Sequence, residues 1–100
     1  MLKDFNDTFV DELKDPEYVA AYLDEAIRDG IPTFLVAMQD VAKANGGMSK
    51  LAQETGLGRE SLYKSLSDQG NPEIKTLLTI LQTLGIRMTF LPGTHATKQA

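Results

Sequence analysis

Apolar residues recur at helical spacing along most of this chain, and local cap, proline and glycine signals divide it into five segments. Asp15-Pro16-Glu17 combines an N-cap, a proline at the first helical position and an acid in the first turn. Gly30, Gly56 and Gly85 stand where a helix is expected to end. The five helices predicted from these signals run over about 15–30, 32–45, 49–55, 59–67 and 71–85.

Each of the three longer helices gathers its apolar side chains on one face, which we expect to be buried. The predicted faces are Val19, Tyr22, Leu23, Ala26 and Ile27 in the first helix, Phe34, Leu35, Met38, Val41 and Ala42 in the second, and Ile74, Leu77, Leu78, Leu81 and Leu84 in the fifth.

The period changes to two over residues 86–91, where Ile86, Met88 and Phe90 fall on one side of a predicted strand. A lone strand needs a partner for its backbone donors and acceptors. That partner is either residues 1–14, which show no clean period and form a loose strand or an arm, or the same strand of a second copy about a two-fold axis. Pairing with a second copy is the favoured alternative.

The predicted fold class is therefore all-α, with five helices and one short C-terminal strand. Residues 1–14 form an N-terminal arm, residues 15–91 the domain, and residues 92–100 a flexible tail. One hundred residues and an apolar fraction of 42% fit a single globular domain with one core. No apolar run approaches the roughly 20 residues that span a bilayer, and the acidic start lacks a signal-peptide layout, so we expect a cytoplasmic protein.

Candidate catalytic chemistry is sparse. The chain has no cysteine, which excludes disulfides, thiol catalysis and cysteine-based zinc sites. Its only histidine, His95, lies in the tail, and Gly46-Gly47 lacks the lysine and spacing of a phosphate-binding loop. We expect neither an enzyme nor a metal or cofactor site.

Charge is distributed unevenly along the chain. Residues 1–30 carry nine acidic and three basic side chains, a net charge of −6, whereas residues 31–100 carry a net charge of +2. Such an asymmetry suggests two different partners, although on charge alone the favoured interpretation is that the acids solvate helix faces.

Residues 51–72, LAQETGLGRESLYKSLSDQGNP, predict two short helices joined by a tight turn. Ala52 keeps the two helices close, Gly56 permits the reversal, and Leu57, Leu62 and Leu66 point inward. Short helices at a steep angle, with a polar exposed start on the second, fit a DNA major groove. The same pattern also fits two packing helices in an all-α domain.

This stretch resembles the helix-turn-helix, here about 49–67, of the phage repressor and Cro class, which implies a lambda-repressor-like fold. With YLDEAIRDG, FLVAMQDVAKANGGM and LLTILQTLGI, the chain is similar to the antidote proteins of bacterial addiction modules up to about Leu91. The matching residues are Tyr22-Leu23, Ala26, Gly47-Met48, Thr55-Gly56-Leu57, Arg59 to Lys64, Leu66 and Gly70-Asn71-Pro72.

The resemblance implies an antitoxin that neutralises a small basic toxin, commonly a ribosome-dependent mRNA-cleaving one, and represses its own operon. The sequence departs from the family pattern in two places. Met48-Ser49 stands where a glutamine often contacts phosphate, and Gly58 stands where a serine or threonine often caps the second helix.

Seven residues are the candidate DNA contacts: Ser49, Lys50, Arg59, Glu60, Ser61, Tyr63 and Lys64. Arg59 is the leading candidate to read guanine, and Glu60 either accepts from cytosine or only stabilises its helix. Lys64, Ser49 and Lys50 suit phosphate. Ser61 fits either role, and Tyr63 packs sideways or touches phosphate.

The candidate toxin contacts lie in the acidic N-terminal region: Phe5, Phe9, Asp11, Glu12 and Glu17. The aromatic side chains among them also suit packing onto the domain's own core. A homodimer through Ile86, Met88 and Phe90 would present two recognition helices to operator DNA. The alternative functions are a transcription regulator without a toxin, and a protein-binding module whose helix pair no longer binds DNA.

Overall fold

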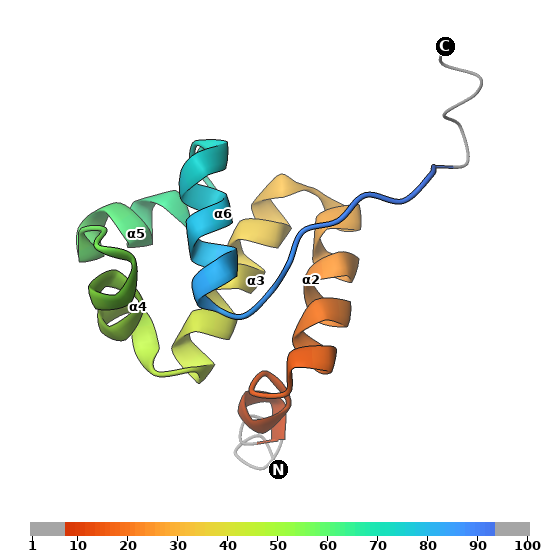
Figure 1. The fold of residues 1–100 in the computed structure, drawn as a ribbon, viewed down its shortest axis with the longest axis horizontal. Helices are drawn as coiled ribbons and strands as arrows, with labels where there is room; N and C mark the ends of the chain where they lie inside the picture. Colours follow the sequence, from red (N-terminus) through yellow and green to blue (C-terminus); the bar gives the residue numbers. More distant parts are fainter. Residues whose placement is uncertain (1–7, 94–100) are drawn as a thin grey trace.

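The computed structural model describes residues 8–93, which fold into packed helices without a strand (Figure 1). Residues 8–12 are also helical. The labelled helices are α2 (Pro16–Asp29), α3 (Ile31–Ala44), α4 (Gly47–Thr55), α5 (Arg59–Ser65) and α6 (Ile74–Thr83). The predicted all-α class and the order of the five helices are confirmed for this part of the chain.

Two cap residues set the limits of α2. Asp15 accepts a hydrogen bond from the Glu17 backbone N–H at 3.1 Å and so begins α2, as predicted. Gly30 donates to the Ala26 carbonyl at 3.2 Å, and its own carbonyl accepts from the Phe34 N–H at 3.0 Å. One glycine therefore closes α2 and opens α3, and its φ of 149° explains why a glycine stands there.

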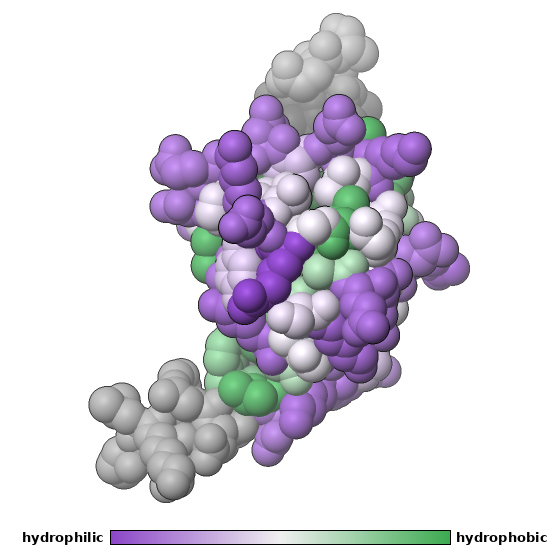
Figure 2. Space-filling view, turned by 90° about the vertical axis from the view of Figure 1, so that its left-hand side faces the viewer, coloured by the Kyte–Doolittle hydropathy of each residue, from purple (hydrophilic) through white to green (hydrophobic). Residues whose placement is uncertain are grey.

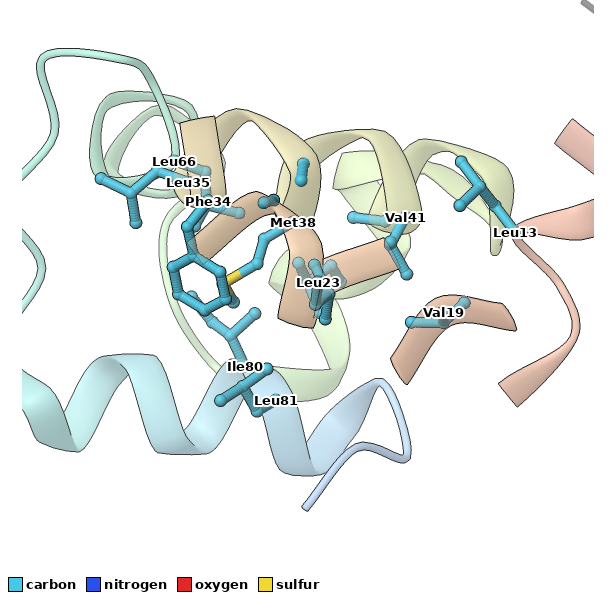
Figure 3. Close-up of a cluster of buried hydrophobic side chains, with 14 of the residues drawn as sticks. Leu13, Val19, Leu23, Phe34, Leu35, Met38, Val41, Leu66, Ile80 and Leu81 are labelled. Carbon is cyan, nitrogen blue, oxygen red and sulfur yellow. The ribbon is translucent and has the colours of Figure 1, made fainter. Parts of the chain in front are cut away.

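α3 lies at the centre of the domain, packed against α2 on one side and α4 on the other, while α4 also contacts α5 and α6. Figure 3 shows Met38 of α3 between Phe34 and Ile80, in a core that draws on every labelled helix. All five predicted positions of α3 are buried. Burial of these side chains is the main source of the fold's stability.

The buried face of α6 differs from the prediction. Ile80 and Leu81 are buried, but Ile74 is 62% exposed and Leu78 is 44% exposed. α6 packs through one face against α4, and that face is rotated toward Ile80. The helix also begins at Ile74 behind Glu73 as N-cap, so Asn71 is not its cap.

The N-terminal segment is part of the packed domain. Leu13, directly after the helical residues 8–12, is only 1% exposed. Asn45 donates from Nδ2 to the carbonyl oxygens of Leu13 and Val41, at 2.8 Å each. The expectation of a loose strand is wrong for residues 8–12, because packing favours a helix there, and the core begins before residue 15. Residues 1–7 lie outside the described part.

The segment after α6 does not form a strand within the single chain. Gly85 takes a φ of 80°, and the Ile86 N–H bonds to the Leu81 carbonyl at 2.9 Å. Ile86 and Met88 then pack partly against the chain's own core, while Phe90 is 87% exposed. Residues 8–12 are helical and cannot be the partner strand. The predicted tail falls largely on residues 94–100, outside the described part.

Candidate nucleic-acid interface

The turn between α4 and α5 is held by backbone and side-chain hydrogen bonds. Gly56 adopts a φ of 77° and donates its N–H to the Ala52 carbonyl at 2.9 Å. Thr55 donates from Oγ1 to the Leu51 carbonyl at 2.7 Å and accepts from the Leu57 N–H at 3.3 Å. The left-handed glycine was predicted, whereas the role of the Thr55 hydroxyl was not. Together they fix the direction in which α5 leaves α4.

The inward face of the pair matches the prediction. Leu51, Leu62 and Leu66 are no more than 3% exposed, and Ala52 and Leu57 are partly buried against the core. Gln39 of α3 also donates from Nε2 to the Leu66 carbonyl at 3.2 Å, across the end of α5. This inward packing leaves the opposite side of α5 to solvent.

Gly70 closes the end of α5 in a way that the sequence did not indicate. Its N–H donates to the Ser67 carbonyl at 2.9 Å. A Cβ at this position would lie 2.1 Å from the Ser65 carbonyl oxygen and 2.8 Å from that of Lys64. These are backbone atoms, which cannot swing aside as a side chain does. Only a glycine therefore lets the chain pass this close to the helix end.

All seven candidate DNA contacts are exposed on α4 and α5. Figure 2 shows the face that carries these helices, and hydrophilic side chains dominate it. Within residues 8–93 the only ion pairs join Lys14 to Asp11 and Arg28 to Asp24. Lys50, Arg59 and Lys64 therefore keep their charge unpaired and available to an anionic ligand.

Two of the basic side chains on this face, Arg59 and Lys50, pack against a neighbouring residue. The Arg59 guanidinium carbon lies 5.4 Å from the centroid of the Tyr63 ring, one helical turn away, in a cation–π contact. The Lys50 stem lies over Gly46, where a Cβ would meet Lys50 Cδ at 2.4 Å. Tyr63 is itself 37% exposed. The contact restricts the Arg59 side chain, which is otherwise exposed to solvent.

The two departures from the family pattern have structural counterparts. Met48 is 3% exposed and belongs to the core, so its side chain has no access to a phosphate. Gly58 is the N-cap of α5, as predicted, with a φ of −68° and no side-chain cap bond. Ser49 and Lys50, which follow Met48 in α4, are both exposed.

The candidate toxin contacts divide into two groups. Phe9 is partly buried, with its ring 5.5 Å from that of Tyr22 in an edge-to-face contact, so it serves the chain's own packing. Asp11, Glu12 and Glu17 are exposed, and Asp11 lies 3.9 Å from the Lys14 ammonium in an ion pair. Phe5 lies outside the described residues.

Other kinds of site find little support in the described ranges. Residues 8–93 contain no group of three or more His, Cys, Asp and Glu side chains that could hold a metal ion. No helix in the same span is long and apolar enough to cross a membrane. His95 falls beyond the described part of the chain.

The described residues form a small all-helical domain with an exposed, polar helix pair, and comparison with known proteins identifies the family of the chain. A family model described as "Probable addiction module antidote protein" matches residues 2–92. A Haemophilus influenzae protein described as uncharacterized is 37% identical over 87 residues, which span 86% of this chain and 87% of that protein. No solved structure matches. The chain belongs to the family of probable addiction module antidote proteins.

Proposed function

We propose that this protein is the antitoxin of a type II toxin-antitoxin module. It binds and neutralises a small basic toxin, and it binds operator DNA to repress its own operon. The observation that carries this proposal is the match to the antidote family, which extends over residues 2–92. The acidic charge of residues 1–30, net −6, suits a basic partner through steering and ion pairs at the rim of the interface.

In this proposal α4, the turn and α5 act as a helix-turn-helix of the lambda-repressor type. α5 enters the major groove, and Arg59 reads guanine through O6 and N7. Lys50 and Lys64 contact phosphate with Ser49, while Glu60 and Ser61 lie where they reach a base edge. The exposure of these side chains and their freedom from ion pairs support the assignment. Tyr63 acts mainly by holding Arg59.

We also propose a homodimer. α4 and α5 contribute only three cations, so one copy neutralises few phosphates and binds weakly. Two copies with recognition helices about 34 Å apart would fit successive major grooves and double the contacts. Residues 86–91 pair antiparallel with the same segment of the second copy. Phe90 contributes most to this interface, because Ile86 and Met88 already pack partly against the core of their own chain.

A transcription regulator without a toxin partner is the second candidate. The outward cations of α4 and α5 favour it as much as they favour the antitoxin. Neither candidate is an enzyme. Copurification separates them: the chain is expressed with the product of the adjacent reading frame and isolated through a tag on that product. The antitoxin predicts a stable complex, formed with and without operator DNA.

A gel shift with the DNA upstream of the gene tests the second half of the proposal. The antitoxin and the regulator both predict a shifted band that weakens steeply with salt. A complex with the adjacent product but no shift would indicate a protein-binding module. A shift without the complex would indicate the regulator.

A further inference from the structure

An open groove of about 600 Å³ lies between α2 and α3 and is also lined by Asp68, which follows α5. Its floor is apolar and its edge is acidic. The floor includes Ala26, Pro32, Val36 and Ala37, and the acidic residues are Glu25, Asp29, Asp40 and Asp68. None of the seven candidate DNA contacts lines it, and neither does any lysine or arginine.

The four carboxylates differ in what they do for the fold. Asp40 accepts a hydrogen bond from the Tyr22 hydroxyl at 3.0 Å, and Asp29 accepts one from the Thr33 hydroxyl. Glu25 and Asp68 are exposed, and within residues 8–93 neither forms an ion pair. The carboxylates of Glu25 and Asp68 therefore have no hydrogen-bond or ion-pair partner among residues 8–93.

Like charges around one groove repel each other until a cation enters. A phosphate backbone is excluded by the sign of the charge. Lysine and arginine side chains suit both parts of the groove, because their methylene stems cover apolar surface while their charged ends reach the edge. The volume is that of a side-chain or small-ligand site, so it accommodates a few residues of a larger partner.

We propose that this acidic groove docks a basic segment of the toxin, with lysine or arginine side chains paired to Glu25 and Asp68 across the floor at Val36. The inference rests on the proposed antitoxin function and deepens it by assigning the docking site. The toxin then contacts α2, α3 and Asp68, and the operator contacts the exposed side chains of α4 and α5, so the two ligands use different residues.

The test measures the affinity of the full-length chain for the product of the adjacent reading frame. The double variant Glu25→Gln with Asp68→Asn removes both of these carboxylates and leaves the Tyr22 and Thr33 hydrogen bonds intact. Glu54→Gln with Glu73→Gln is the matched control, because it makes the same charge change at two exposed acids outside the groove. A third variant, Val36→Lys, places a cation on the floor at a side chain that is 39% exposed.

The groove variant is expected to bind at least about tenfold more weakly than wild type, with a shallower salt dependence, while the control pair changes affinity much less. Val36→Lys is expected to weaken binding as well. Operator affinity and the unfolding midpoint serve as checks that the variants remain folded. Equal weakening by the groove and control pairs, or unchanged affinity in the groove pair, would overturn the docking site and leave the antitoxin function standing. Absence of binding by wild type would instead contradict the proposed function.

Discussion

Gly70 shows how a single residue can be fixed by its surroundings rather than by its own backbone angles. A Cβ there would lie 2.1 Å from the Ser65 carbonyl oxygen, at the C-terminal end of α5. We expect Gly70→Ala to destabilise the domain by about 1–3 kcal/mol, the usual cost of overpacking. Urea unfolding followed by circular dichroism measures the difference.

The matched control for Gly70 is Gly93→Ala. Gly93 has no atom within 4 Å of the position that a Cβ would take, so the substitution should leave the unfolding midpoint unchanged. Equal stability of the two variants would show that the chain relaxes around residue 70 and would refute the argument from close contact.

A substitution of Arg59 tests the proposed recognition of DNA bases at a single residue. Arg59→Ala is expected to weaken operator binding by about 1–3 kcal/mol and to relax discrimination at one base pair, because it removes the proposed bidentate contact to guanine. Arg59 is exposed, so folding should be unaffected. Fluorescence anisotropy with the operator and with single-base variants measures both effects. A variant that discriminates among these sites as wild type does would remove Arg59 from base readout.

Individual side chains were predictable where their chemistry is local. Leu62 and Leu66 were correctly predicted to be buried, because apolar residues at that spacing must point away from a polar helix face. Gln39 and Asn45 were not predicted to bond to the Leu66 and Leu13 carbonyls, which lie 27 and 32 residues away in sequence. Such contacts depend on how distant segments pack, and one sequence carries no direct signal for them.

At the level of the helices, the hydrogen bond between Tyr22 of α2 and Asp40 of α3 makes the free energy of unfolding depend on pH. Burial, together with the hydrogen bond to Asp40, raises the pKa of Tyr22 to about 12 from its ordinary value of 10. The unfolded chain releases this proton at lower pH than the folded chain does. The stability associated with Tyr22 is therefore complete below pH 10 and is lost as pH rises toward 12.

Tyr22→Phe is the comparison that isolates this effect. It keeps the edge-to-face contact with Phe9 but removes the titrating hydroxyl. Between pH 9 and pH 11, wild type should lose more unfolding free energy than the variant does, because lysine titration is common to both. Urea unfolding at the two pH values measures the loss. Parallel losses in the two proteins would contradict the raised pKa.

The helices were predicted well because their limits are set locally, by residues such as Asp15 and Gly30. The face that each helix buries was harder to predict. Ile74 and Leu78 fall on the apolar stripe of α6 but are exposed, because α6 meets α4 on a face rotated toward Ile80. Periodicity shows that a helix has an apolar side, whereas the packing partner decides which residues of that side are covered.

At the scale of the whole molecule, the end of the segment after α6 is left uncovered by the single chain, and the proposed dimer would cover it. Phe90 and Leu91 are more than 80% exposed, although they are large apolar side chains. Phe90→Pro removes a backbone donor at an exposed position, so it should convert the proposed dimer to a monomer without unfolding the helices. Sedimentation equilibrium measures the mass.

Gly93→Pro is the control for Phe90→Pro, because it introduces the same residue just beyond the predicted strand. It should remain dimeric. A dimeric Phe90→Pro protein would rule out strand pairing as the basis of the assembly. The sequence predicted an extended segment here but could not show that Ile86 and Met88 pack partly onto their own core.

Neutralisation of a toxin is the proposed activity of this protein, and growth of a bacterial culture tests it directly. The adjacent reading frame is expressed from one inducible promoter and this chain from another. We expect growth to stop when the adjacent product is made alone and to resume when this chain is made with it. Unimpaired growth with the adjacent product alone, or arrest that persists despite an excess of this chain, would contradict the antitoxin function.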